Sequence, residues 1–382
     1  MKLFLTFFML AGGVIASPRS WNDYTDSLQD KMQEQSISTD TINKIFSQIK
    51  YLSHTVSKDS SQAEFIKTFE NYYSKRITER RIEAGKIAWE EHRLLLNRAY
   101  KKFGIHPRYL LSFWGLETNY GKTKGNNQLL SALTSLAFDG RRRTFFEKQL
   151  FAVTRAIDKK KLPLKNLTGS WAGAFGHFQF MPTTYESYAI DGNGDGKIDL
   201  VNNIPDAVFS AGNYLSKMGW DREKTWGREV IATKNFDWKK YKEGEKKPLK
   251  DWDKLGIRKT NKQRLPRLDI EAKLIVPQGS NGALFLVYDN FNRIMKWNRS
   301  TFYAITVGRL ADRIIGYSKL KKLKKEKKLT DKQVKKAQEQ LKQKGFYRGK
   351  IDGIIGKGMR KAIRDFEIKN DLPVNGNMDS VL

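Results

Sequence analysis

The chain has 382 residues, 39% of them hydrophobic, and its 71 basic and 41 acidic residues give a net charge of +30. This composition supports a core for two or three globular domains, and the charge favours an anionic partner: nucleic acid, anionic lipid or a cell-wall polymer. The absence of cysteine excludes disulfides and thiolate chemistry, and the spacing of the four histidines disfavours a histidine-rich zinc site.

The N-terminus carries the pattern of an export signal. Lys2 precedes an apolar run over residues 3–15, and Ala16 provides a cleavage site before Ser17. The run is shorter than the ~20 residues that a membrane-spanning helix needs, so we predict a secretory signal peptide over residues 1–16. A buried N-terminal helix is the alternative. Because no cysteine is available for a lipid anchor, we expect an exported, periplasmic protein without stable membrane insertion.

Helices are predicted for most of the chain before residue 220. The tract 79–100 contains no proline, and a new helix is expected to open at Pro107, because proline is tolerated in a first helical turn. Between residues 221 and 290 short apolar runs predict strands, so this part should form a small mixed subdomain. Residues 298–315 return to a helical pattern.

The helix that follows Pro107 carries a carboxyl group on its apolar face. The positions i, i+3, i+4 and i+7 of this face are Leu110, Phe113, Trp114 and Glu117. Burial among apolar side chains raises the pKa of a carboxyl group, which allows a glutamic acid to donate a proton near neutral pH. Taken alone, the segment is equally consistent with a solvated glutamate at a fraying helix end.

Two sequence motifs favour the first interpretation. Residues 117–121 are Glu-Thr-Asn-Tyr-Gly, and residues 169–182 form a loop rich in glycine and aromatic residues. Glycines allow the backbone to approach a sugar closely, and aromatic rings can stack on pyranose faces. Together the two stretches resemble the motifs of the superfamily of goose-type lysozymes and lytic transglycosylases, which implies that Glu117 is the catalytic acid/base.

Three further stretches narrow this resemblance. Residues 130–143, 206–220 and 290–304 are similar to the B-type lytic murein transglycosylases, glycoside hydrolase family 103. The resemblance implies a mainly α fold, with a lysozyme-like α+β catalytic domain over residues 17–318 that includes the mixed subdomain at about 221–290. It also implies a saccharide groove lined by Ser170, Gln179, Tyr214, Asn298 and Tyr303, with Arg142 and Arg143 contacting substrate carboxylates. Trp297 stands where this family usually has tyrosine, and His177-Phe178 replaces an aromatic-glycine pair.

The number of carboxylates bears on the mechanism. An ordinary glycosidase needs two of them across the scissile bond, and only Glu117 has motif support. The resemblance implies that Glu117 alone cleaves the β-1,4 bond between N-acetylmuramic acid and N-acetylglucosamine, leaving a 1,6-anhydromuramic acid end. The alternatives are a hydrolytic muramidase on the same fold and a non-catalytic protein that binds cell wall or nucleic acid. The export signal argues against intracellular nucleic acid.

Residues 191–199 match the beginning of an EF-hand calcium loop, but the twelfth position is Asn202 rather than a bidentate glutamate. The B-type family has a variant loop that a later aspartate closes. The resemblance therefore implies a Ca²⁺ ion bound by Asp191, Asn193, Asp195, the Lys197 carbonyl and Asp206. The ion would be structural, since the chemistry requires no cofactor. An ion-free, glycine-rich turn is the alternative.

A lysine-rich stretch precedes the C-terminal unit. Residues 319–336 contain ten lysines, and we predict a solvated linker over residues 319–332. Residues 333–382 place Val334 and Leu341 on one helix face and then form a glycine-punctuated loop. This unit resembles the three-helix peptidoglycan-binding domain of wall hydrolases. The expected partner is therefore the peptidoglycan glycan strand rather than nucleic acid, and we expect a monomer.

Overall fold

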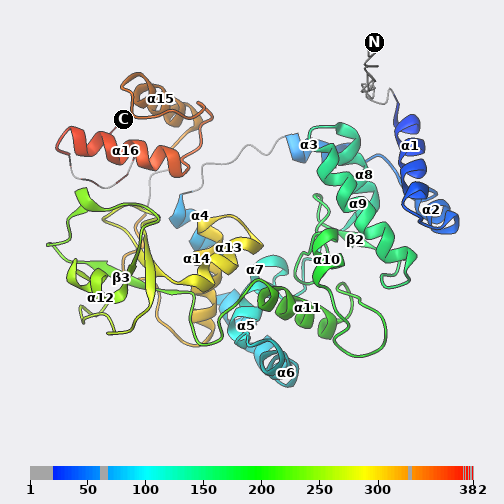
Figure 1. Ribbon diagram of the computed structural model, residues 1–382, viewed down its shortest axis with the longest axis horizontal. Helices are drawn as coiled ribbons and strands as arrows, with labels where there is room; N and C mark the ends of the chain where they lie inside the picture. The colour runs from blue at the N-terminus through cyan, green and yellow to red at the C-terminus, as the bar shows by residue number, and fades with distance from the viewer. Residues whose placement is uncertain are drawn as a thin grey trace, which may run out of the picture.

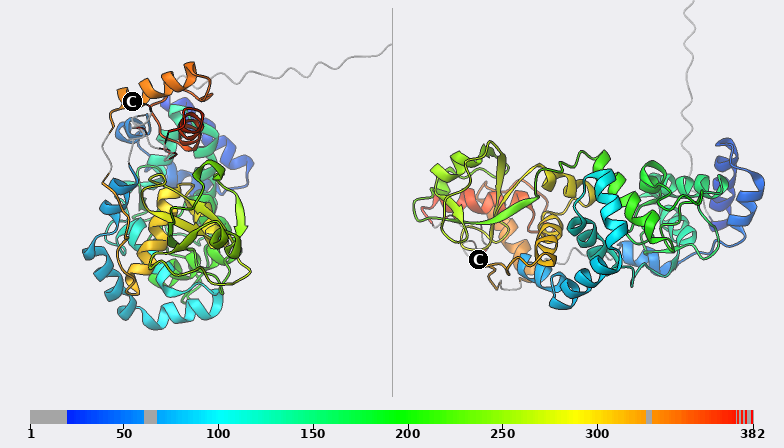
Figure 2. Two further views of the ribbon diagram at one scale, coloured as in Figure 1. Left: turned by 90° about the vertical axis from the view of Figure 1, so that its left-hand side faces the viewer. Right: turned by 90° about the horizontal axis from the view of Figure 1, so that it is seen from below.

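The computed structural model describes residues 20–60, 68–325, 329–372, 374, 376, 378 and 381. The signal peptide predicted over residues 1–16 lies outside the described residues. Figure 2 shows an elongated molecule, with α1 and α2 at one end and the mixed subdomain near the other. None of the helices in the described part has both the length and the apolar character to cross a membrane.

Helices build the main body, as the sequence predicts. In chain order these are α1 (Trp21–Glu34), α2 (Thr39–Phe46), α3 (Ser53–Ser60), α4 (Phe69–Arg76), α5 (Glu79–Glu91), α6 (Arg93–Phe103), α7 (Pro107–Thr118), α8 (Leu129–Asp139), α9 (Arg143–Asp158), α10 (Pro182–Tyr188), α11 (Ile204–Lys217), α13 (Asp289–Trp297) and α14 (Thr301–Ile314). A short antiparallel pair, β1 (Asn127–Gln128) with β2 (Thr168–Gly169), joins the start of α8 to the second motif. Figure 1 shows α7 near the middle of the molecule, where it packs against α5 and α14.

The helix α7 is the central helix of this body. It begins at Pro107, as predicted, and the His106 side chain accepts a hydrogen bond from the Arg108 amide at its N-terminus. Leu110, Leu111 and Phe113 are fully buried, because neighbouring helices cover α7 on several sides. The core therefore fixes the position of the helix that ends next to Glu117.

The mixed subdomain is a five-stranded antiparallel sheet with strand order β4-β6-β7-β3-β5. Its strands are β3 (Gly227–Ala232), β4 (Lys246–Pro248), β5 (Ile257–Lys259), β6 (Glu271–Ile275) and β7 (Leu284–Val287), and α12 (Leu249–Lys254) packs beside it. Alternate residues of β7 face opposite sides. Phe285 and Val287 join the core of the helical body, whereas Leu284 and Leu286 join the core of the subdomain. The central strand therefore joins the two cores.

The C-terminal unit contains α15 (Asp331–Gln343) and α16 (Lys357–Lys369), which share a small core around Val334, Leu341 and Ile363. The resemblance implies a third helix in this unit, and after residue 372 the structure describes only residues 374, 376, 378 and 381. Figure 1 places α16 beside the mixed subdomain. The Arg364 guanidinium contacts Glu243 of that subdomain at 2.7 Å, so the unit is docked on its neighbour.

The lysine-rich stretch differs in part from the predicted solvated linker. Its lysine side chains are exposed over residues 319–325, but Leu320 and Leu323 pack against the main core. Its backbone is also bound: the Lys321 amide donates to Glu229 at 2.9 Å, and the Lys324 carbonyl accepts from Gln278 at 2.7 Å. The prediction from charge overlooked the packing of Leu320 and Leu323. Residues 319–325 therefore lie along the mixed subdomain and are not a freely solvated linker.

Candidate active site

The end of α7 explains the Glu-Thr-Asn-Tyr-Gly motif. The helix stops because Asn119, Tyr120 and Gly121 all adopt positive φ angles, of 51°, 58° and 83°. A Cβ atom at Gly121 would lie 2.5 Å from the His177 ring, so the position has no room for a side chain. The motif therefore ends the helix at Thr118 and leaves Glu117 in its last turn.

His177 joins this helix end to the second motif. Its Nδ1 atom accepts a hydrogen bond from the Trp114 indole at 2.9 Å, and its carbonyl accepts one from the Thr118 hydroxyl at 2.7 Å. Burial lowers the pKa of His177 to about 4, with a further contribution from Lys124, so the ring stays neutral. This departure from the family pattern therefore has a structural explanation, since a neutral imidazole can accept the indole proton.

The carboxyl group of Glu117 lies in a site of donors and aromatic rings and is only partly exposed. The Tyr303 hydroxyl donates a hydrogen bond to it. Burial raises the pKa of Glu117 to about 7, although the Tyr303 hydrogen bond, the Trp297 indole and the Arg76 charge oppose the rise. At neutral pH the group is thus divided between its acid and base forms, as proton transfer in both directions requires.

The aromatic rings form a continuous cluster from Glu117 to Tyr214. Trp297 lies 4.4 Å from Phe113 and 5.0 Å from Tyr214, measured between ring centroids. Phe180 of the second motif lies 5.5 Å from Trp297. The structure thus brings Tyr214 and Tyr303, both predicted from the sequence, to the same side of the molecule as Glu117.

The polar residues of the second motif are held by their own loop. The Ser170 hydroxyl accepts from the Ala174 amide at 3.0 Å. Gln179 has a φ of 50°, and its amide nitrogen donates to the carbonyls of Lys124 and Gly176, both at 3.0 Å. Asn298 is the exposed C-cap of α13, next to Trp297. Contacts of Ser170, Gln179 and Asn298 with a saccharide remain predictions.

Arg142 and Arg143 have partners away from Glu117. Arg142 forms an ion pair with Asp59, a buried residue of α3, and Arg141 joins the same carboxylate. Arg143 donates to the carbonyls of Ala137 and Phe138, 3.3 and 3.4 Å away, at the end of α8. These contacts give both arginines a structural role. Contact with a substrate carboxylate remains a prediction.

Sequence analysis missed the cation beside Glu117. Arg76, at the end of α4, contributes a positive charge to the Glu117 site and lies 3.7 Å above the Tyr72 ring. Tyr72 in turn interacts electrostatically with Glu117. Both residues are about 40 positions before Glu117 and lie outside the motifs described above, so only the tertiary structure reveals them.

The calcium-like loop has an ordered arrangement of its own. The buried Asp206 carboxylate accepts from the amides of Gly192 and Asp199 at 2.8 and 2.7 Å, and the Asn193 side chain donates to Asp195 at 2.8 Å. Burial raises the pKa of Asp206, and the nearby charges of Asp191 and Asp195 raise it further. Within the described residues, no three acidic, histidine or cysteine side chains are already arranged as a metal site.

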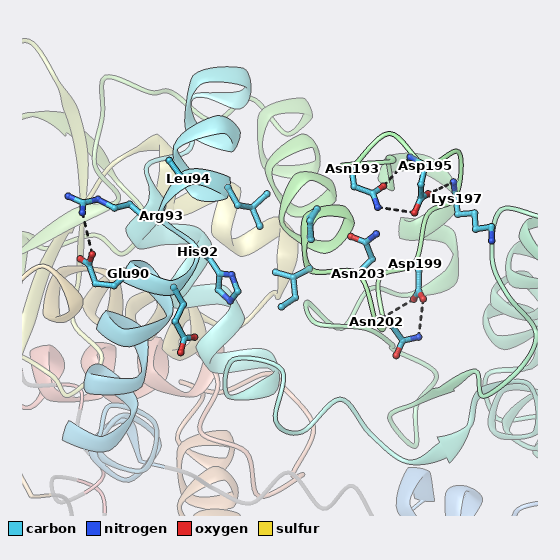
Figure 3. Close-up of a pocket in the computed structure, with 14 residues that line it drawn as sticks. Glu90, His92, Arg93, Leu94, Asn193, Asp195, Lys197, Asp199, Asn202 and Asn203 are labelled. Atoms are coloured by element: carbon cyan, nitrogen blue, oxygen red, sulfur yellow. Dashed lines mark hydrogen bonds and ion pairs between the residues drawn. The ribbon is translucent and has the colours of Figure 1, made fainter.

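A pocket of about 910 Å³ separates this loop from the α5–α6 junction. Figure 3 shows His92 and Arg93 on one side and Asp195, Asp199 and Asn202 on the other. Its lining contains no tryptophan, tyrosine or phenylalanine on which a sugar ring could stack. The cluster at Glu117 is therefore the better candidate for a saccharide site.

Comparisons with known proteins agree with these features. The model of the transglycosylase SLT domain matches residues 20–312, and the model of a putative peptidoglycan binding domain matches residues 330–382. Membrane-bound lytic murein transglycosylase B of Escherichia coli (strain K12) is 32% identical over 245 residues, which span 64% of this chain and 66% of that protein.

Solved structures extend the likeness to almost the whole chain. SltB3 from Pseudomonas aeruginosa, in complex with NAG-anhNAM-pentapeptide, has a TM-score of 0.89 at 33% identity and covers 94% of this chain and 96% of its own. The Escherichia coli lytic transglycosylase Slt35, in complex with calcium, has a TM-score of 0.65 at 28% identity over 76% of this chain and 92% of its own.

Proposed function

The chain belongs to the transglycosylase SLT domain family of peptidoglycan lytic transglycosylases, and we propose that it cleaves the β-1,4 bond between N-acetylmuramic acid and N-acetylglucosamine. The observation that carries this proposal is Glu117, whose pKa is raised to about 7 by burial and whose carboxyl group accepts a hydrogen bond from the Tyr303 hydroxyl. The lysozyme-like fold, shared with SltB3, supports a saccharide substrate.

In the first step Glu117 acts as the acid. Its protonated form gives its proton to the glycosidic oxygen, and the bond to C1 of N-acetylmuramic acid breaks as the 2-acetamido group supports the developing positive charge. Protonation of the leaving oxygen is favoured because burial keeps part of the Glu117 population neutral at pH 7. The Tyr303 hydroxyl then stabilises the carboxylate that remains.

In the second step the same carboxylate acts as the base. It takes the proton from the C6 hydroxyl, whose oxygen closes on C1, and a 1,6-anhydromuramic acid end forms without water. The groups that act on the Glu117 pKa are the Tyr303 hydroxyl, the Trp297 indole and the Arg76 guanidinium, and no other carboxylate of the described chain is among them. This environment favours one group with two roles over a pair of carboxylates.

A hydrolytic muramidase on the same fold is the second candidate, because a water could replace the C6 hydroxyl in the second step. We favour the intramolecular reaction because SltB3, the structural relative described above, has been crystallised with an anhydromuramic ligand. We further infer that the chain acts in the periplasm, on the basis of the export signal predicted over residues 1–16.

The proposal is tested by Glu117→Gln, which keeps the shape of the side chain and removes its titration. We expect purified sacculi to release no soluble muropeptides with this variant, while the melting temperature stays close to that of the wild type. Glu83→Gln is the matched control, since Glu83 is an exposed residue of α5 that pairs only with Lys86 in the described chain. Digestion of sacculi by Glu117→Gln would rule out the assignment.

We also propose that the loop over residues 191–206 binds Ca²⁺. The donors Asp191, Asn193, Asp195, the Lys197 carbonyl and Asp206 would all present oxygen atoms, which this ion prefers. The repulsion that Asp191 and Asp195 exert on buried Asp206 is the effect that a cation would relieve. The related Slt35 structure contains calcium. The ion would stabilise the loop and take no part in the reaction.

A further inference from the structure

Residues 319–325, here called the lysine strip, are attached to the fold at several points. Leu320 and Leu323 pack against the core of the helical body. The side chain of Gln278, which is buried in the mixed subdomain, makes two hydrogen bonds with the backbone of Lys324. It donates to the carbonyl at 2.7 Å and accepts from the amide at 3.2 Å. A segment bound through apolar side chains and through its backbone has little conformational freedom, so the lysines extend from fixed backbone positions.

The lysine strip carries positive charge that the described chain leaves largely unpaired. It contains five lysines, all exposed, and no acidic residue. Lys319 pairs with Glu79 at 2.9 Å. Glu229 accepts a hydrogen bond from the backbone amide of Lys321 at 2.9 Å and also attracts the charge of its side chain. Among the described residues, no ion pair forms with the other four lysine side chains, which are those of Lys321, Lys322, Lys324 and Lys325.

The lysine strip lies between two regions that match families acting on peptidoglycan. The match to the transglycosylase SLT domain ends at residue 312, and the match to the putative peptidoglycan binding domain begins at residue 330. The C-terminal unit is docked on the mixed subdomain through Arg364 and Glu243, 2.7 Å apart, and Gln278 holds the strip to the same subdomain. A polymer that contacts both regions is therefore brought close to these four charges.

Peptidoglycan carries the complementary charge on its peptides. Its N-acetylated sugars are uncharged, whereas the stem peptides on the muramic acid residues bear free carboxylates. We propose that the lysine strip is a binding surface for the stem-peptide carboxylates of peptidoglycan and holds the polymer against the protein. This inference rests on the proposed function. Each exposed charge contact is weak, but several contacts on one ordered segment act together.

The test compares two variants that lose the same charge, both in the whole chain carrying Glu117→Gln, so that binding is measured without cleavage. The strip variant combines Lys321→Gln, Lys322→Gln, Lys324→Gln and Lys325→Gln. The matched control replaces four exposed lysines of the helical body that form no ion pair in the described chain, namely Lys50, Lys58, Lys101 and Lys165.

Binding is measured by sedimentation with purified sacculi. At low salt the strip variant should bind roughly tenfold more weakly than the Glu117→Gln parent, because each exposed contact contributes a factor of about two, and the control should bind like the parent. The difference should disappear in about 1 M salt, where the screening length falls to about 3 Å. Sacculi stripped of stem peptides by an amidase should bind both variants equally.

Three results would overturn the inference. Equal binding of both variants to intact sacculi would make the strip a spacer. A loss that persists on peptide-free glycan would exclude the stem carboxylates. A loss of affinity for DNA or anionic phospholipid vesicles, with affinity for sacculi intact, would assign the strip to another partner. Muropeptides released into the supernatant by the Glu117→Gln parent would instead refute the proposed function, whereas binding is measured in the pellet.

Discussion

The side chain of Glu117 illustrates what one residue's position in the sequence can and cannot reveal. Its spacing from Phe113 and Trp114 places it on the apolar face of a helix, which predicts a raised pKa. The size of the rise depends on tertiary neighbours, because Tyr303 and Trp297 come from segments about 180 residues later in the chain. Local periodicity holds no information about those residues.

The raised pKa of Glu117 makes a prediction about pH. The first step needs the protonated form, so kcat/KM should be level at acidic pH and fall tenfold per unit above a pKa of about 7. The measurement is the initial rate of muropeptide release at low substrate concentration across a pH series. A limb near 4.5, the ordinary glutamate value, would show that the carboxyl group is solvated.

His177 shows a different limit at the residue scale. The sequence marks it as a departure from the family pattern but gives it no role. In the structure its ring accepts from Trp114, and its carbonyl accepts from Thr118, so it joins the catalytic helix to the second motif. A histidine that acts as a buried acceptor can only be recognised once its donor is known.

At the scale of elements, the sequence predicts local features well. Proline at the first helical position sets the start of α7, and two of the short apolar runs between residues 221 and 290 correspond to β6 and β7. The sheet order β4-β6-β7-β3-β5 was not predictable, because β3 pairs with β7 across more than 50 residues. Such pairing depends on which faces the two cores bury, and periodicity within a strand does not specify its partner.

The loop over residues 191–206 carries a prediction about a single element. Calcium should raise the melting temperature, since a ligand at 100 times its Kd that binds only the folded state adds about 2.7 kcal/mol to stability. Differential scanning fluorimetry in calcium and in chelator measures the shift, which Asp191→Asn should reduce. Asp30→Asn, an exposed position on α1, should keep it. Identical melting curves in calcium and chelator would count against the ion.

At the scale of the whole molecule, the C-terminal unit is attached by more than its linker. Arg364 is nearly buried between Glu243, at 2.7 Å, and the Tyr241 ring, at 5.6 Å, and Lys239 adds an exposed contact with Asp371 at 3.1 Å. The resemblance to a wall-binding domain predicted this unit but not its docking. The sequence could not show the docking, because the partner residues lie in a subdomain that has no motif.

This docking predicts how an interface variant behaves. Glu243→Ala leaves the Arg364 charge nearly buried without its partner, which should weaken the docking by about 1–3 kcal/mol. We expect trypsin to cleave this variant faster within residues 319–336. The rate of cleavage is measured by gel electrophoresis of samples taken over time. Glu245→Ala, which removes a separate pair with Lys247, is the control and should be cleaved at the wild-type rate. Equal cleavage of all three proteins would show that the contact does not hold the unit in place.

The whole account depends on a single carboxyl group that donates a proton in the first step and takes one back from the C6 hydroxyl in the second, without water entering the product. Mass spectrometry of muropeptides released from purified sacculi in H₂¹⁸O tests this most directly. The account predicts products that end in 1,6-anhydromuramic acid, one water lighter than the reducing forms and free of ¹⁸O. Reducing ends that carry one ¹⁸O atom would contradict it and identify the protein as a hydrolytic muramidase.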